Sequence, residues 1–186
     1  PEYPNVFNPD ETGLQDVLFM GVHSFGGLGA SMKGMAVGRK QGSAQWHIYE
    51  FNNDGLSNGD RARCSGYYTF MPSAGDEDSW QFASSCYFNN IFFYASGNKI
   101  YRWYYNTATS FPTEPWRTLD DLEGAEITSL AVSPDNQQLY VGVYQPQASG
   151  LNGSFYLLNC NTGKNEGDSP YLNVAYKPLK VVYKPR

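Results

Sequence analysis

The sequence predicts an all-β protein, and three features of the chain support this fold class. Apolar runs of strand length alternate with turn signals, most clearly between residues 127 and 164. Aromatic residues make up 16% of the chain, and aromatic side chains favour strands. The 19 glycines and 11 prolines supply many turns, and no long segment keeps a helical period of apolar positions.

The clearest segment, residues 127–164, has the pattern of a β-meander, in which short turns join successive antiparallel strands. Its predicted strands are residues 127–132, 139–144 and 155–160. The Ser-Pro-Asp-Asn stretch at 133–136 predicts a turn, because proline fixes φ and the Asp and Asn side chains bond to nearby backbone. Asn-Thr-Gly at 161–163 predicts another. A meander of this kind resembles one blade of a β-propeller.

The same pattern recurs upstream, as a blade requires, since one small sheet cannot bury both of its faces alone. The second copy has predicted strands at 82–87, 91–95 and 100–105, and a weaker third copy has them at 17–22, 35–38, 46–51 and 61–70. Gly97 and Asn98 predict a two-residue hairpin turn. Aligning Tyr49, Tyr101 and Tyr156 gives spacings of 52 and 55 residues, near the roughly 40–50 residues of known propeller repeats.

We therefore predict a partial β-propeller of about three four-stranded antiparallel blades, or about twelve strands in total. Residues 1–14 are expected to be an extended lead-in, and residues 15–186 the partial propeller, with blades at about 15–70, 80–119 and 126–184. The last strand is predicted over residues 171–183, because its side chains alternate between a drier and a wetter face. An antiparallel sandwich, which also separates its strands by turns, is the alternative.

The charge of the chain argues against a nucleic-acid partner. The formal net charge is −5, whereas nucleic-acid binders usually carry a basic face. Acidic residues cluster just before residue 127 and lysines gather near the C-terminus, which we interpret as two solvated surfaces. No apolar run reaches the roughly 18 residues that indicate a membrane-spanning helix, so no direct membrane span is expected.

The three cysteines predict neither a disulfide framework nor a metal site. Cys64, Cys86 and Cys160 are an odd number, and no pair has metal-ligand spacing. Cys86 and Cys160 lie in predicted strands, so we expect them to be small buried hydrophobic residues.

The sequence contains no catalytic motif, and we predict no catalytic residue, metal site or cofactor. The two histidines, His23 and His47, lie on different predicted strands without a convincing carboxylate partner. The Gly-rich stretch at 24–29 is not followed by a helix, which a phosphate-binding loop would need. The acidic loop at 52–60 lacks the ligand spacing of a calcium loop, so a solvated loop is the better interpretation.

Four aromatic residues are the candidate ligand-binding residues: Trp103, Tyr104, Tyr105 and Trp116. On a strand, Tyr101, Trp103 and Tyr105 would share one face and Tyr104 the other. One interpretation is that these rings pack between blades. The alternative is a stacking platform for a sugar or peptide, since aromatic rings supply large contact area.

Several short motifs resemble known propeller repeats. Ser-Pro-Asp before Leu-Tyr-Val, and the later FYLLNCNTG, look like generic repeats of the YVTN and WD40 kind. Residues 133–140 are similar to the Asp box of sialidase propellers, although Gln137 stands where that motif has glycine, and the box is structural in that family. FFYASGNKIYRW and the ending KVVYKPR are similar to the C-terminal propeller part of PKD-like family surface lipoproteins of Bacteroidetes. That resemblance, over roughly residues 80–186, implies an exported parent protein anchored through a segment outside this chain.

These observations favour a non-enzymatic binding or scaffold module of an exported bacterial surface protein, with a glycan or protein ligand. A propeller hydrolase or lyase acting on polysaccharide is the alternative class, and a structural spacer between domains is a third. Propellers usually close a ring of about four to eight blades. Three blades leave open ends, so we expect either missing blades of a longer chain or self-association of the copies through those ends.

Overall fold

A computed structural model gives the fold of the protein. The structure describes residues 14–24, 32–40, 42–52, 63–70, 77–84, 91–104, 110–120, 124–168 and 170–182. Within these ranges the fold is all-β, with twelve strands in three antiparallel sheets and a single 3-10 turn, η1 (Glu77–Ser79), as the one helical element. The predicted all-β class is therefore confirmed. Residues 1–13 of the predicted lead-in lie outside the described ranges, and Leu14 already begins the first strand.

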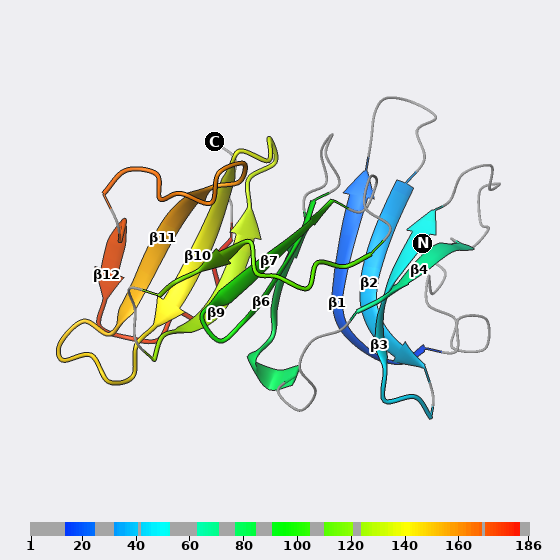
Figure 1. Ribbon diagram of the computed structural model, residues 1–186, viewed down its shortest axis with the longest axis horizontal. Helices are drawn as coiled ribbons and strands as arrows, with labels where there is room; N and C mark the ends of the chain where they lie inside the picture. Colours follow the sequence, from blue (N-terminus) through cyan, green and yellow to red (C-terminus); the bar gives the residue numbers. More distant parts are fainter. Residues whose placement is uncertain are drawn as a thin grey trace, which may run out of the picture. The chain divides into compact units, whose positions relative to one another are not determined.

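The chain divides into two compact units, which we describe separately. The first comprises residues 1–73 and 108–111, and the second residues 74–107 and 112–186. The sheet of the first unit consists of β1 (Leu14–Ser24), β2 (Met32–Lys40), β3 (Trp46–Asn52) and β4 (Arg63–Thr69). Its strands follow one another in chain order, each antiparallel to the last (Figure 1).

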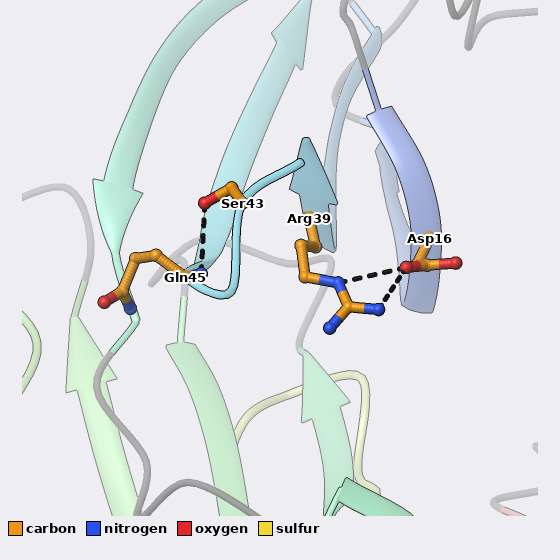
Figure 2. A network of polar contacts seen from close by, with 4 residues as sticks. All are labelled: Asp16, Arg39, Ser43 and Gln45. Carbon is orange, nitrogen blue, oxygen red and sulfur yellow. Dashed lines mark hydrogen bonds and ion pairs between the residues drawn. The ribbon is translucent and has the colours of Figure 1, made fainter. Parts of the chain in front are cut away.

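Side chains at one end of this first sheet connect its strands. Arg39 on β2 stands opposite Asp16 on β1 and Trp46 on β3. Its Nε and Nη2 groups donate to Asp16 Oδ2 at 3.0 and 2.5 Å (Figure 2), and its guanidinium lies 4.9 Å from the centre of the Trp46 ring. In the β2–β3 turn, the Gln45 amide N–H donates to Ser43 Oγ and the Gln45 side chain donates to the Phe70 carbonyl. One ion pair and one turn therefore fix the ends of β1 to β4.

The second unit contains the other two sheets. One consists of β5 (Gln81–Ser84), β6 (Ile91–Ser96), β7 (Lys99–Tyr104) and β8 (Arg117–Thr118), and the other of β9 (Glu126–Val132), β10 (Gln138–Tyr144), β11 (Gly153–Asn159) and β12 (Leu172–Val174). Both are antiparallel meanders in chain order (Figure 1). Gly97 has a φ of 57° in the two-residue turn between β6 and β7. Glycine fits that position because a two-residue hairpin turn needs a left-handed residue there.

The core of the second unit lies between the facing sides of these two sheets. Alternation along each strand supplies it, because every second side chain points to the same face. Its buried members include Ile91, Phe93, Ala95 and Ile100 from one sheet and Leu139, Val141, Val143, Tyr156 and Leu158 from the other. Backbone bonds join the sheets as well, since the Ile127 amide donates to the Gly97 carbonyl at 2.8 Å. Apolar packing between paired sheets therefore stabilises the unit.

The turn predicted at residues 133–136 is present and is held by its own side chains. Ser133 Oγ donates to Asp135 Oδ1 at 2.5 Å, and the Gln137 amide donates to the same oxygen at 3.1 Å. These two hydrogen bonds, chiefly the one from Ser133, hold the pKa of Asp135 below its ordinary value of 3.8. Asn136 has a φ of 60°, a left-handed conformation that asparagine tolerates better than most residues. The sequence pattern therefore predicted both the place and the chemistry of this turn.

The prediction of a final strand over residues 171–183 is wrong. Strand β12 has three residues and ends at Val174. The C-terminal segment, which we define as residues 175–182, then crosses the outer face of the β9–β12 sheet. Lys177 Nζ bonds Glu126 Oε2 at 2.9 Å and lies 5.4 Å from the Tyr144 ring centre, and Pro178 lies beside Gly142. Pro178 has no amide N–H, so it cannot extend a strand ladder at that point.

Candidate functional site

The candidate site is built around Arg102, which sits on β7 with its side chain toward the β9–β12 sheet. Its guanidinium carbon lies 4.9 Å from the ring centre of Tyr104 and 4.9 Å from that of Trp116. Tyr104 is on the same face of β7, two residues further on, and Trp116 immediately precedes β8. All three side chains are partly exposed. The cation therefore contacts two aromatic rings at the surface of the second unit.

The backbone of the facing sheet completes the surroundings of Arg102. Its Nη1 group donates to the carbonyls of Cys160 and Asn161, the second at 3.1 Å. These carbonyls belong to the turn after β11. Asn159 stabilises this turn, because its Oδ1 accepts hydrogen bonds from the amide groups of Asn161 and Thr162. We call Arg102, Tyr104, Trp116 and the turn 160–163 the Arg102 cluster.

Gly163 lets the turn come close to the Trp116 indole. It has a φ of 71°, and a Cβ added there would lie 3.3 Å from Trp116 Cε2. Trp116 also packs on Phe93 of the core, with 5.4 Å between ring centres. The Trp116 ring is thus held by the core on one side and by the turn on the other. Its orientation is set before any ligand arrives.

Cys160 beneath this cluster is an inert buried thiol rather than a nucleophile. It is fully buried and forms no disulfide. Burial raises its pKa to about 12, although the positive charge of Arg102 acts in the opposite direction. A thiol with such a pKa is not ionised near neutral pH, and the thiolate is the reactive form. Cys160 is therefore a small buried hydrophobic residue, as predicted.

The structure separates the four aromatic residues that the sequence singled out. Trp103 lies on the opposite face of β7 from Tyr104, as strand alternation predicted, and is 1% exposed. Tyr104 and Trp116 come together around Arg102. Tyr105 lies outside the described residues. The ligand-binding prediction consequently concentrates on Tyr104 and Trp116.

Arg102 was not among the site residues predicted from the sequence, although the sequence contains a signal for it. Arg102 and Tyr104 are two residues apart, so they lie on the same face of a strand. A stacking platform was the alternative interpretation of these rings, and in the structure the Arg102 guanidinium lies against both Tyr104 and Trp116. No local pattern could show that Trp116 and the turn 160–163 lie beside Arg102, because tertiary packing brings them there.

The two histidines are not a metal-binding pair. His23 pairs with Lys33 and His47 pairs with Gly38, and both partners lie on β2. Five residues along a strand span roughly 17 Å, which is too far for one ion. Within the described ranges, no group of three or more His, Cys, Asp or Glu residues could hold a metal. The loops at 24–29 and 52–60, and Cys86, lie largely or wholly outside those ranges.

Comparison with known proteins does not assign a family. The chain matches no protein-family model, and no curated protein is similar to it at a significant level. Among the residues that the structure describes, no helix is long and apolar enough to cross a membrane. The functional interpretation therefore rests on the sheets and on the Arg102 cluster.

Proposed function

We propose that the three sheets are blades of a partial β-propeller, which acts as a non-enzymatic binding module of an exported bacterial surface protein. Two observations support the blade interpretation. Each sheet is a four-stranded meander in chain order, and the two sheets of the second unit pack face to face around a shared core. Export and surface attachment enter the proposal through the resemblance of residues 92–103 and 180–186 to surface lipoproteins.

The ligand that we propose is a glycan, bound at the Arg102 cluster. The single observation that carries this proposal is the pair of partly exposed rings, Tyr104 and Trp116, that is fixed around one arginine. Aromatic rings offer flat apolar area at low entropic cost, and a polar tip or neighbour supplies direction. Sugar rings have both an apolar face and hydroxyl groups, so they match a site with rings and a hydrogen-bond donor.

The proposal predicts that removing the indole of Trp116 abolishes most glycan binding. We expect Trp116→Ala to weaken binding by about tenfold or more, which corresponds to about 1.4 kcal/mol. A glycan array identifies the ligand, and calorimetric titration then measures affinity. Tyr176→Ala is the matched control, because Tyr176 is an aromatic residue that is 81% exposed on the C-terminal segment. It should bind like the wild type.

Trp116→Phe separates binding from packing, because Trp116 also contacts the core. The phenyl ring keeps an aromatic contact with Phe93, so this variant should fold and show a smaller loss of affinity. The proposal is wrong if no glycan binds the wild-type protein. It is also wrong if both Trp116 variants fold and bind as tightly as the wild type. Binding of a peptide in place of any glycan would contradict the choice of ligand.

Incomplete ring closure predicts self-association. The C-terminal segment covers part of the outer face of the β9–β12 sheet but presents Tyr176, Leu179 and Val182 to solvent at 81%, 84% and 72% exposure. Exposed apolar surface of this kind favours contact with another molecule. Light scattering on a sizing column should show dimers or larger species whose fraction rises with concentration. A stable monomer at high concentration would contradict the proposal of open blade ends.

A further inference from the structure

We infer that the glycan bound at the Arg102 cluster is an acidic one, whose carboxylate pairs with the guanidinium of Arg102. This inference rests on the proposed function and adds the chemical class of the sugar. Arg102 differs from two other cations of the protein in the groups that surround its charge.

Two other cations have a carboxylate partner within the protein. Arg39 pairs with Asp16 at 2.5 Å (Figure 2), and Lys177 pairs with Glu126 at 2.9 Å. Arg39 is a close parallel to Arg102, because it too lies 4.9 Å from the centre of a tryptophan ring. The partners of Arg102, however, are two backbone carbonyls and two rings, all of them neutral. Among the described residues, no carboxylate lies within ion-pair distance of Arg102.

A second arginine adds to the positive charge on the same face. Arg117 on β8 pairs with Ile100 on β7, and Arg102 lies two residues from Ile100. Side chains at such diagonal positions share a face, with Cα atoms about 7–8 Å apart. The Nε of Arg117 is buried and has no hydrogen-bond acceptor within the described part of the chain. Among the described residues, neither of these two arginines is paired with a carboxylate, although the net charge of the chain is −5.

Two carboxylates in the turns close to Cys160 are engaged elsewhere. The Cys160 amide donates to the Gln137 carbonyl, and the Glu166 amide donates to the Leu157 carbonyl, which places Asp135 and Glu166 in this region. Asp135 accepts from Ser133 and Gln137 in its own turn. Glu166 accepts from the side-chain amides of Gln138 and Asn159, both at 2.8 Å. A counter-ion for Arg102 can therefore come from a ligand.

Arg102 keeps the donors that a carboxylate needs. A guanidinium has five N–H donors, and Nη1 makes both of the bonds to backbone carbonyls. Nε and Nη2 have no acceptor within the described residues, and these two groups form the edge that binds a carboxylate with two parallel bonds. Tyr104, Trp116 and the turn 160–163 hold the guanidinium in place, which lowers the entropic cost of binding. The rest of the sugar then contacts the exposed parts of the two rings.

The test compares an acidic sugar with its neutral counterpart. A uronic-acid trisaccharide is titrated calorimetrically into the full chain, beside the same trisaccharide with each carboxylate reduced to a hydroxymethyl group. We expect the acidic sugar to bind about tenfold or more tightly, as a charge-assisted bond contributes that much. Its affinity should fall with added salt, because part of the site is exposed. The neutral sugar should show no such dependence.

Variants then assign this preference to Arg102. Arg102→Gln should lose the preference for the acidic sugar, whereas Arg102→Lys, which keeps a charge without the fork of donors, should keep part of it. Arg39→Gln is the matched control, since it removes an arginine stacked on tryptophan that already has its carboxylate. It should leave both affinities unchanged. Near-ultraviolet circular dichroism checks that each variant is folded.

Each outcome separates this inference from the proposed function. Equal affinity of the wild type for the acidic and neutral sugars overturns the inference and leaves glycan binding intact. An acidic preference that survives in folded Arg102→Gln also overturns it. Absence of binding to any glycan overturns both. Tighter binding of a hexaglutamate peptide than of the acidic sugar would show that the carboxylate comes from a protein ligand, which contradicts the inference. If Arg102→Gln does not fold, the comparison of sugars and the salt dependence decide.

Discussion

Replacing Leu139 by alanine is expected to lower the free energy of unfolding by about 2–5 kcal/mol, the range found for large buried aliphatic residues. Leu139 is fully buried on β10, between the two sheets of the second unit. Its removal takes apolar contacts from the core and leaves a cavity that two strand-bonded sheets cannot easily collapse. Urea denaturation followed by tryptophan fluorescence measures the change.

Leu179→Ala is the matched control for this substitution. Leu179 lies on the C-terminal segment and is 84% exposed, so the same chemical change should alter stability by less than about 0.5 kcal/mol. A loss at Leu139 no larger than the loss at Leu179 would show that the two sheets do not share a core. A selective loss at Leu139 supports the face-to-face packing on which the blade interpretation depends.

Replacing Gly153 by alanine is expected to displace the C-terminal segment and to cost about 1–3 kcal/mol, as overpacking typically does. A Cβ at this position would run into the backbone carbonyl of Tyr176 and lie 2.8 Å from Val174 Cγ2. A backbone carbonyl cannot rotate away as the end of a long side chain can. Relief therefore requires β12 or the segment after it to move off the sheet.

Limited trypsin digestion detects that movement, because Lys180 lies on the C-terminal segment and is followed by valine. Cleavage after Lys180 should be faster in Gly153→Ala than in the wild type. Gly150→Ala serves as the control for loss of a glycine. Gly150 has a φ of 92° and open space around it, so its replacement strains the backbone by about 1–2 kcal/mol without touching the segment. Equal cleavage in both variants would contradict the crowding at Gly153.

The strand and turn pattern of the second unit was predictable from local sequence. Apolar runs of strand length between turn signals predicted β9, β10 and β11, and the Ser-Pro-Asp-Asn tetrapeptide predicted the turn between the first two. These strands and this turn depend on residues that are close together in the sequence, because side-chain alternation and φ preferences are local properties of the backbone. The same alternation correctly placed Trp103 and Tyr104 on opposite faces of β7.

The path of residues 175–182 was decided by the tertiary structure. An alternating pattern predicted a strand here, yet Lys177 is drawn to Glu126 and Tyr144, which lie far from it in the sequence. Small residues on the outer face of the sheet, Gly142 and Gly153, leave room for the segment to cross. Alternation predicts a strand only when a neighbouring strand edge accepts it, and that condition is not local.

Part of the candidate site was likewise predictable from the sequence, and part of it depends on the tertiary structure. The sequence by itself determined that β7 carries aromatic residues and that Arg102 shares a face with Tyr104. Only the tertiary structure decided that Trp116 and the carbonyls of the turn 160–163 surround that arginine and that Trp103 is buried. The physical reason is that the surroundings of a cation depend on which groups packing brings within a few ångströms. Electrostatic and aromatic contacts fall off over that distance, whatever the separation along the chain.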